Sequence, residues 1–420
     1  MAARSVLAAN HVGGWTKPSP AQYPHQWNWD SGFISLGWAT FDWETAAAEI
    51  ESILRGAWRD GMVPHVRYDR AHLAAYFPGP DRWPGMERQV AQRGELTSGI
   101  SNPPIVATAA LRIGRAAPDP DRRDAFWRRV LPPLEAWLRW FFSGRRLPGS
   151  PLVAVVHPWE TGWDNSPRWD LLRQAGLRPR RAYERLDTRA VSASQRPTGR
   201  DYDAYIALAE IISEADFDLA GYRSRTPFVV YDAVFDALVF RAAHDVNAIA
   251  DALGQSRPIS ESDLAEFALA FDEFHWDAHS NRYLDWDAQA GRHIDTASAA
   301  TVACLAGGIV PADRVGLIAE AYLARCGAAE PICSVPPGAP AFDPDNYWRG
   351  PVWVNVNWLV IEGLEMAGLD RAAASLKAST LAMVERQGFA EYFNPVDRAA
   401  RGSGGFSWTA ALTLDLLERT

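Results

Sequence analysis

The chain has 420 residues, of which 48% are hydrophobic and 22% charged, and its formal net charge is −9. This composition is typical of a globular protein, and the acidic balance argues against a nucleic-acid partner, which would need a basic face. No apolar run approaches the roughly 18 residues of a membrane helix, and residues 1–15 lack the apolar core of a secretory signal. The three cysteines have no CxxC spacing, so we expect neither a disulfide framework nor a zinc site, and we expect a cytoplasmic protein without a membrane segment.

Helical periodicity dominates the sequence. Apolar residues recur at positions i, i+3, i+4 and i+7, for example at Tyr205, Leu208, Ala209 and Ile212. The predicted helices cover residues 43–58, 103–117, 124–142, 201–215, 231–253, 260–276, 297–310, 312–324, 353–368, 371–388 and 405–419. Strand signals are sparse, and the best of them, at residues 281–294, predicts a short hairpin.

Long connections rich in Gly, Pro, Trp and Asp separate the helices. They are residues 12–32, 61–70, 76–101, 143–168, 178–200, 327–352 and 389–404. Long loops in a compact helical protein are usually functional. About a dozen helices with alternating short and long loops predict an all-α fold, an (α/α)6 barrel made of a double ring of helices. Because no low-complexity linker and no fixed repeat is present, we expect one domain over residues 1–420.

Tryptophan is the compositional outlier. The chain has 19 tryptophans, and several of them lie in polar stretches such as YPHQWNWDSG at residues 23–32. Exposed aromatic faces beside a carboxylate suit stacking on the C–H face of a sugar, whereas the alternative is that the indoles simply pack large helices. Composition alone leaves both interpretations open.

The segment HPWETGWDNSPRWD at residues 157–170 places Glu160 and Asp164 beside two tryptophans. A carboxyl group pressed against indole and shielded from water has a raised pKa, which a general acid at neutral pH requires. The alternative is that Asp164 is the N-cap of the helix that follows.

Residues 388–412 supply a second candidate carboxylate. Glu391 follows a predicted helix, and a Gly-rich loop leads on to Phe406 and Trp408. A carboxylate at this place could activate a water molecule, whereas the alternative is a surface Glu near a helix C-terminus.

The segment DPDNYWRGPVWVNVNWL at residues 343–359 combines Tyr347, Trp348, Arg349 and Trp353 at the start of a helix. It offers stacking faces and a cation, or else a packed junction between loop and helix.

Two places in the sequence offer histidines as candidate binding residues. His65 follows a proline and could bond a sugar hydroxyl, although a lone His is more often a structural donor. His275, Asp277 and His279 could suggest a metal site, but further ligands at suitable spacing are missing, so no metal is expected.

Eight motifs in order give a specific resemblance. They are YPHQWNWDSG, GMVPHV, YFPGPDRW, TSGISNPP, HPWETGWDNSPRWD, RPTGRDYDAY, YWRGPVWVNVNW and EYFNP…GFSWTAAL. From about residue 10 to the C-terminus the chain resembles glycoside hydrolase family 63, in particular its bacterial mannosylglycerate and glucosylglycerate hydrolase group. The resemblance implies an (α/α)6 barrel that hydrolyses α-linked sugars with inversion and needs no metal or organic cofactor.

Carried over by motif, the resemblance makes Asp164 the general acid and Glu391 the general base, and an inverting pair should stand roughly 6.5–9.5 Å apart. It implies that Arg196 and Tyr202 reach the glycerate side of the substrate, where a guanidinium would hold a carboxylate. Without the resemblance, Arg196 would be interpreted as a solvated loop charge. The residues implied to surround the sugar are Tyr23, Trp27, Trp29, Asp30, His65, Tyr76, Asn102, Trp163, Tyr347, Trp348 and Trp353.

Three departures from the family pattern bear on specificity. Asn102 in SGISNPP stands where the family has a longer amide, His25 stands where an aromatic residue is more usual, and the loop at 396–405 differs. None of them is the acid or the base, so hydrolysis is still expected.

The leading hypothesis is therefore a hydrolase of glucosylglycerate or mannosylglycerate. Its rivals are an α-glucosidase of the same fold acting on neutral disaccharides or glucosylglycolate, a sugar isomerase or epimerase with a catalytic His, and a binding protein without catalysis. The choice between gluco and manno sugars rests on one hydroxyl and stays open. We also expect a homo-oligomer, a dimer or tetramer, and candidate lids at residues 60–80 and 178–200.

Overall fold

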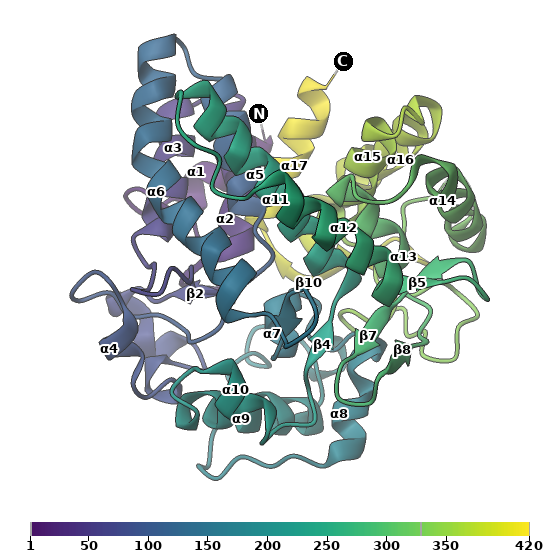
Figure 1. The fold of residues 1–420 in the computed structure, drawn as a ribbon. Helices are drawn as coiled ribbons and strands as arrows, with labels where there is room; N and C mark the ends of the chain where they lie inside the picture. Colours follow the sequence, from purple (N-terminus) through teal and green to yellow (C-terminus); the bar gives the residue numbers. More distant parts are fainter. Residues whose placement is uncertain (1, 328–329, 420) are drawn as a thin grey trace.

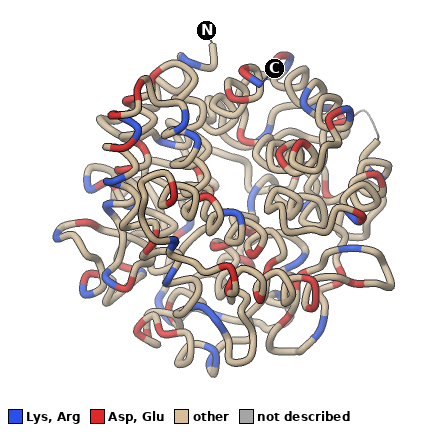
Figure 2. Tube along the Cα trace, turned by 45° about the horizontal axis from the view of Figure 1, so that its top comes forward, with Lys and Arg blue, Asp and Glu red and all other residues tan. Residues whose placement is uncertain are grey.

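The computed structural model describes residues 2–327 and 330–419. Figure 1 shows a mainly helical molecule, in which the long helices lie around a common centre and most short helices and strands gather at one end. Among the described helices, none is long and apolar enough to cross a membrane. Figure 2 shows acidic and basic residues interspersed along the chain rather than separated onto two faces.

Within the described residues, an inner ring of helices closes on itself. Each inner helix contacts the next, and the last, α17, returns to α2. Most of their residues are buried, and α2 and α15 are buried on nearly every side, as their lack of a polar face predicts. The ring consists, in order, of α2 (Asn28–Ala39), α5 (Ile105–Arg115), α11 (Ala233–Ala252), α13 (Ala300–Ala303) with the 3₁₀ turn η5 (Cys304–Gly307), α15 (Val354–Met366) and α17 (Ser407–Glu418).

An outer ring alternates with the inner one along the chain. Each outer helix packs on its inner neighbours, and its exposed face carries the charged residues. The outer helices are α1 (Ala2–Asn10), α3 (Trp43–Leu54), α6 (Pro120–Gly144), α12 (Glu261–His275), α14 (Ala312–Cys326) and α16 (Asp370–Gln387). The prediction of an all-α barrel with a double ring of helices is confirmed.

Glycines set how closely the inner helices approach. A Cβ atom on Gly37 would lie 2.3 Å from the Cα atom of Ala411, where α2 meets α17. A Cβ atom on Gly307 would lie 2.5 Å from the carbonyl oxygen of Ala237, where η5 meets α11. No real side chain tolerates these distances, so the closed ring depends on glycine at its contacts.

The connections between helices differ in length according to their direction. Those that lead from an inner to an outer helix are short, whereas those that lead from an outer to an inner helix are long and lie at one end of the barrel. The long connections cover residues 11–27, 55–104, 145–232, 276–299, 330–353 and 388–406. They contain α4 (Met86–Gln89), α7 (Pro158–Thr161), α8 (Asp170–Ala175), α9 (Gly199–Glu214) and α10 (Leu219–Arg223).

All described strands lie in these connections, and every pairing is antiparallel. One four-stranded sheet has the order β3-β4-β7-β8, and three strand pairs are separate from it. The four-stranded sheet consists of β3 (Ala154–Val155), β4 (Val230–Tyr231), β7 (Asp285–Asp287) and β8 (Arg292–Ile294). The pairs are β1 (Gln26–Trp27) with β2 (Val66–Arg67), β5 (Trp276–Asp277) with β6 (Arg282–Tyr283), and β9 (Ala390–Phe393) with β10 (Ala400–Gly404).

Several sequence-based boundaries were wrong. The segment 12–32 is not one connection, because α2 begins at Asn28, and α1 and α2 were not predicted. Helix α2 is buried nearly all round, so it lacks the amphipathic period that reveals a helix. The helix predicted at 297–310 is a short α13 followed by a 3₁₀ turn, and the helix predicted at 43–58 ends at Leu54. Of the segment predicted as a hairpin, residues 285–294 form one, the β7–β8 pair, whereas Arg282–Tyr283 pairs with β5.

Candidate active site

A cavity lies at the end of the barrel where the long connections meet. It is lined by Pro18, Tyr23, Trp27, Trp29, Asp30, His65, Tyr76, Asn102, Trp159, Gly162, Asp164, Arg196, Tyr202, Tyr347, Trp348, Glu391, Phe406 and Trp408. These residues come from the connections that precede five different inner helices, or from the first turns of those helices. The barrel thus gathers side chains that are far apart in the sequence.

Strand pairing joins the first two of these connections. Trp27 of β1 pairs with Val66 of β2, and the backbone N–H of Asn28 donates to the carbonyl oxygen of His65 at 2.9 Å. This pairing places Trp27 and His65 at one wall of the cavity. Trp29 and Asp30 follow in the first turn of α2, where the positive end of the helix dipole favours a carboxylate.

Four buried polar atoms in the cavity wall have no partner among the described residues. They are Nδ1 of His65, Oδ1 of Asn102, Nε1 of Trp348 and Nε1 of Trp408. A buried polar atom without a partner is costly, so these atoms need a ligand or water that supplies hydrogen bonds. Aromatic faces together with such unmatched donors and acceptors fit a ring that carries hydroxyl groups.

The shorter amide of Asn102 has a fixed orientation. Its Nδ2 donates to the carbonyl oxygens of Trp159 at 3.0 Å and Glu160 at 3.3 Å, so only Oδ1 is left for the cavity. Asn102 therefore presents an acceptor, which a ligand hydroxyl would have to meet as a donor.

Asp164 lies on the loop between α7 and α8. It is not a helix N-cap, because Ser166 occupies the N-cap of the next 3₁₀ turn, and the hydroxyl of Tyr205 donates to its backbone carbonyl at 2.8 Å. Burial raises the pKa of the Asp164 carboxyl to about 7, against the opposing effect of the Arg196 guanidinium. A large fraction of Asp164 is therefore protonated at neutral pH.

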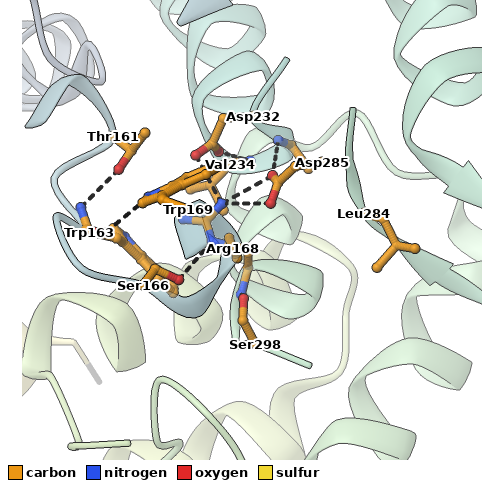
Figure 3. A network of polar contacts seen from close by, with 12 residues as sticks. Thr161, Trp163, Ser166, Arg168, Trp169, Asp232, Val234, Leu284, Asp285 and Ser298 are labelled. Atoms are coloured by element: carbon orange, nitrogen blue, oxygen red, sulfur yellow. Dashed lines mark hydrogen bonds and ion pairs between the residues drawn. The ribbon is translucent and has the colours of Figure 1, made fainter. Parts of the chain in front are cut away.

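A buried ionic network of Arg168, Asp232 and Asp285 anchors this loop to the barrel (Figure 3). The Nη1 atom of Arg168 bonds to Asp232 at 2.9 Å and to both carboxylate oxygens of Asp285 at 3.0 Å. Asp232 also caps α11 by accepting from the backbone N–H groups of Val234 and Phe235. The network therefore anchors the Asp164 loop to an inner helix and to β7.

Aromatic and polar contacts complete the support of the loop. The Arg168 guanidinium lies 4.9 Å from the ring centre of Trp163 and 4.3 Å from that of Trp169. The side chain of Asn165 accepts from the backbone N–H of Trp348 at 3.0 Å. The loop that carries Asp164 is thus fixed to the segment that carries Trp348.

Glu391 lies on β9 and is 1% exposed, so it is not a surface carboxylate. Its Oε1 accepts from the Tyr23 hydroxyl at 2.7 Å, and its Oε2 accepts from the backbone N–H of Ser403 at 2.9 Å. Burial raises the pKa of Glu391, while the Arg196 guanidinium and the hydrogen bond from Tyr23 act in the opposite direction. These donors favour the ionised form.

The strand opposite Glu391 must contain a glycine. Gly402 of β10 has φ +68°, and a Cβ atom at this position would lie 2.4 Å from Oε2 of Glu391. Any side chain here would therefore displace the carboxylate.

Arg196 is buried between Asp187 and Glu391 and is not a solvated loop charge. It is 4% exposed, and its Nη1 donates to the Tyr23 hydroxyl at 2.8 Å and lies 3.4 Å from Oε1 of Glu391. Its Nε bonds to Asp187 at 3.3 Å, and its guanidinium lies 4.2 Å from the ring centre of Tyr347. Among the described residues these contacts leave Nη2 to meet a ligand.

Burial shifts the pKa of two further titratable groups of the wall toward the neutral form. Burial raises the pKa of Asp30 well above its ordinary value, and burial lowers the pKa of His65 to about 3. The His65 imidazole is therefore neutral and offers one donor and one acceptor, as recognition of hydroxyl groups requires.

Comparisons with known proteins identify the family of the chain. The model of the mannosylglycerate hydrolase MGH1-like glycoside hydrolase domain matches residues 23–409. The chain belongs to this glycoside hydrolase family. It is 40% identical over 418 residues to a mannosylglycerate hydrolase of Thermus thermophilus, covering 99% of each chain. It is 33% identical over 440 residues to a glucosylglycerate hydrolase of Mycolicibacterium hassiacum, covering 99% of this chain and 97% of the relative.

The fold of this glycoside hydrolase also matches a solved structure. A family 63 mannosylglycerate hydrolase of Thermus thermophilus, crystallised with Tris and D-glycerate, superposes with a TM-score of 0.91 at 38% identity over 99% of both chains. The predicted resemblance to family 63 is confirmed.

Two predicted sugar-binding residues of the glycoside hydrolase do not line the cavity. Trp353 stacks on Trp348 with ring centres 3.8 Å apart, and Trp163 also stacks on Trp348, with ring centres 5.0 Å apart. Both support Trp348 rather than offer a face to a ligand, because each is itself packed into the core. The remaining predicted residues, including the acid and base candidates, all line the cavity.

Sequence reasoning missed five wall residues of the enzyme: Pro18, Trp159, Gly162, Phe406 and Trp408. Trp159 and Gly162 lie in the same motif as Asp164, and the last two lie in GFSW, so membership in these motifs was the available signal. Pro18 had none. In the candidate metal group, His275 is buried, and its two ring nitrogens contact Asp236 at 3.1 Å and the carbonyl oxygen of Leu284 at 2.8 Å, so neither is left for a metal.

Proposed function

We propose that this glycoside hydrolase is an inverting α-glycosidase that converts glucosylglycerate or mannosylglycerate to free hexose and glycerate. Asp164 acts as general acid and Glu391 as general base. The observation that carries the proposal is that two carboxyl groups with different surroundings line one cavity together with a buried guanidinium. Relatives named mannosylglycerate hydrolase and glucosylglycerate hydrolase support the substrate class.

The two carboxyl groups divide the work because of their surroundings. Asp164, with a pKa of about 7, is a proton donor at neutral pH and gives its proton to the glycosidic oxygen. Glu391, held by Tyr23, Ser403 and Arg196, accepts a proton from a water molecule that attacks the anomeric carbon from the opposite ring face. The configuration at that carbon inverts, so an α-glycoside releases the β anomer.

The aglycone carboxylate meets Arg196 and Tyr202. A guanidinium binds a carboxylate with charge-assisted hydrogen bonds, and this contact distinguishes glycerate from a neutral aglycone. The sugar ring lies against Trp27, Trp29 and Trp348, and the free atoms of His65, Asn102, Trp348 and Trp408 meet its hydroxyl groups.

Proton NMR of the reaction with each glycoside tests the proposal. Release of the β anomer at early times from glucosylglycerate or mannosylglycerate supports it and identifies the sugar. Early release of the α anomer contradicts inversion. Cleavage of neutral α-glucosides while neither glycerate glycoside is consumed would instead favour the rival α-glucosidase.

The roles of the two carboxyl groups predict the kinetics of their amide variants. Asp164→Asn and Glu391→Gln should each lower kcat by about 10²–10⁴-fold, since each removes one proton-transfer group while keeping the side chain's shape. Initial rates and near-ultraviolet circular dichroism of the purified variants check this. An active Glu391→Gln variant with native spectra would remove Glu391 from the mechanism.

Location, assembly and domain number stay predictions. We propose a cytoplasmic homo-oligomer, a dimer or tetramer, which cell fractionation and light scattering of the purified protein test. We also propose one domain over residues 1–420, supported by a single cluster of buried apolar side chains that extends from Ala3 to Leu416.

A further inference from the structure

Two cysteines that the proposed reaction does not use lie in contact at the end of the outer helix α14. Sγ of Cys326, the last residue of α14, is 3.3 Å from Sγ of Cys333. Both are free thiols, Cys333 is buried, and Cys326 is partly exposed to solvent. Cys304, the third cysteine, is buried on the inner ring.

Hydrogen bonds hold the backbone on the Cys333 side of the pair. The Tyr322 hydroxyl of α14 donates to the carbonyl oxygen of Cys333 at 3.1 Å. The adjacent Ile332 exchanges two hydrogen bonds with the side chain of Asn357 on α15, at 2.7 Å and 2.9 Å. Closing the two sulfur atoms to the bond length of about 2.05 Å therefore needs a movement of little more than about 1 Å between groups that are already side by side.

We propose that Cys326 and Cys333 are an oxidation site that forms an intramolecular disulfide with peroxide as the oxidant. Cys326 is the attacking thiol and Cys333 the resolving thiol. The assignment follows from geometry, because Cys326 is partly exposed, Cys333 is buried, and their sulfur atoms are 3.3 Å apart. A partly exposed thiol with a second thiol beside it is the arrangement that reacts reversibly with peroxide.

The two steps balance without another reagent. The Cys326 thiolate attacks one oxygen of hydrogen peroxide, the O–O bond breaks, and Cys326 sulfenic acid and hydroxide form. The Cys333 sulfur then attacks the Cys326 sulfur, the S–O bond breaks, and the thiol proton and the leaving hydroxide form water. Two thiols are oxidised, and one peroxide is reduced to two waters. The hydrogen bond from the Cys333 thiol lowers the pKa of Cys326, which favours the first step.

The disulfide would join an outer helix to the backbone that supports the active site. Cys333 pairs with Val352, and Val352 pairs in turn with Phe393 at the end of β9, the strand of Glu391. Val352 also follows closely on Trp348 in the chain. Oxidation would therefore tie α14 to the segment that pairs, through Val352, with the strand of Glu391. The proposal does not depend on which sugar the enzyme cleaves.

Mass spectrometry of the peroxide-treated full-length protein tests the proposal. The expected result is an intact mass lower by about 2 Da, one thiol left that reacts under denaturing conditions, and a peptide that joins Cys326 to Cys333. Three reactive thiols after treatment, or a link that involves Cys304 or a second chain, would overturn it.

Matched variants show whether the disulfide forms between Cys326 and Cys333 or involves Cys304. Cys304→Ser should still lose about 2 Da, whereas Cys326→Ser and Cys333→Ala should not. In wild type the oxidised form should unfold at a higher temperature than the reduced form, and this difference should vanish in Cys326→Ser. Loss of about 2 Da in Cys326→Ser would contradict the assignment even if one variant folded poorly.

Discussion

At the scale of single residues, Arg196 influences both carboxyl groups that we propose as acid and base. It contacts Glu391, and its charge lowers the pKa of both Glu391 and Asp164 against the effect of burial. The same guanidinium is the proposed partner of the substrate carboxylate. A substrate without a negative charge would therefore meet the same acid and base but would lack the ion pair that orients it.

Removal of this charge should move the whole pH profile. In wild type the rate should fall as pH rises through about 7, since Asp164 must be protonated, and should fall in acid, since Glu391 must be ionised. In Arg196→Gln both pKa values rise, so both limbs of kcat/KM against pH should shift to higher pH. The KM for the acidic substrate should rise as well.

Arg189→Gln is the matched control, because Arg189 lies in the same segment but pairs with Glu184 at the surface. It should leave both limbs unchanged. An Arg196→Gln profile that superposes on wild type would show that Arg196 acts on neither carboxyl group.

Gly402 provides a second test at this scale. A Cβ atom at residue 402 would push against Oε2 of Glu391, and φ +68° disfavours any other residue. Because a shift of about 1 Å in a catalytic group can cost about 10²-fold, Gly402→Ala should lower kcat by about that factor. Gly404→Ala on the same strand meets no atom within 4 Å and should keep full activity, as steady-state kinetics would reveal.

At the scale of structural elements, a network of buried charged side chains holds the loop that carries Asp164 in place. The Arg168 guanidinium joins the loop to Asp232 at the start of α11 and to Asp285 on β7, and all three side chains are buried (Figure 3). A buried ion pair adds little net stability, but removal of one partner leaves an uncompensated charge.

Arg168→Met should therefore lower the free energy of unfolding by about 3–5 kcal/mol, because two buried carboxylates would face each other without a cation. Urea denaturation measures this loss, and kcat should fall with it because the loop of Asp164 loses its anchor. Glu362→Gln breaks a second buried network, with Arg112, Arg241 and Arg419, which does not line the cavity. It should cost stability while kcat of the folded fraction is unchanged.

Closure of the inner ring is a property of the whole molecule. Its ends meet where α17 packs on α2, and Gly37 leaves no space for a side chain against Ala411. Gly37→Val should therefore lower the free energy of unfolding by about 1–3 kcal/mol or more, as overpacking does. Gly316→Ala on the outer helix α14 meets no atom within 4 Å and should instead stabilise the protein by about 0.5–1 kcal/mol, as denaturant midpoints would reveal.

By itself the sequence determined the helical barrel, the family and most of the cavity wall. Amphipathic outer helices such as α3 and α14 were readable because one face is apolar, and the long motifs around Asp164 and Glu391 carried the resemblance. Helix α2 was not readable, because burial on all sides removes the periodic signal.

Tertiary structure alone decided which aromatic residues face the cavity. Trp348 and Trp353 stand in one motif, yet Trp348 lines the cavity while Trp353 packs behind it, because the chain turns between them. Likewise, the burial of Arg196 between Asp187 of its own connection and Glu391 of β9 depends on connections from two different parts of the ring. Local patterns encode which helices form, whereas the surroundings of a side chain arise only when the ring has closed.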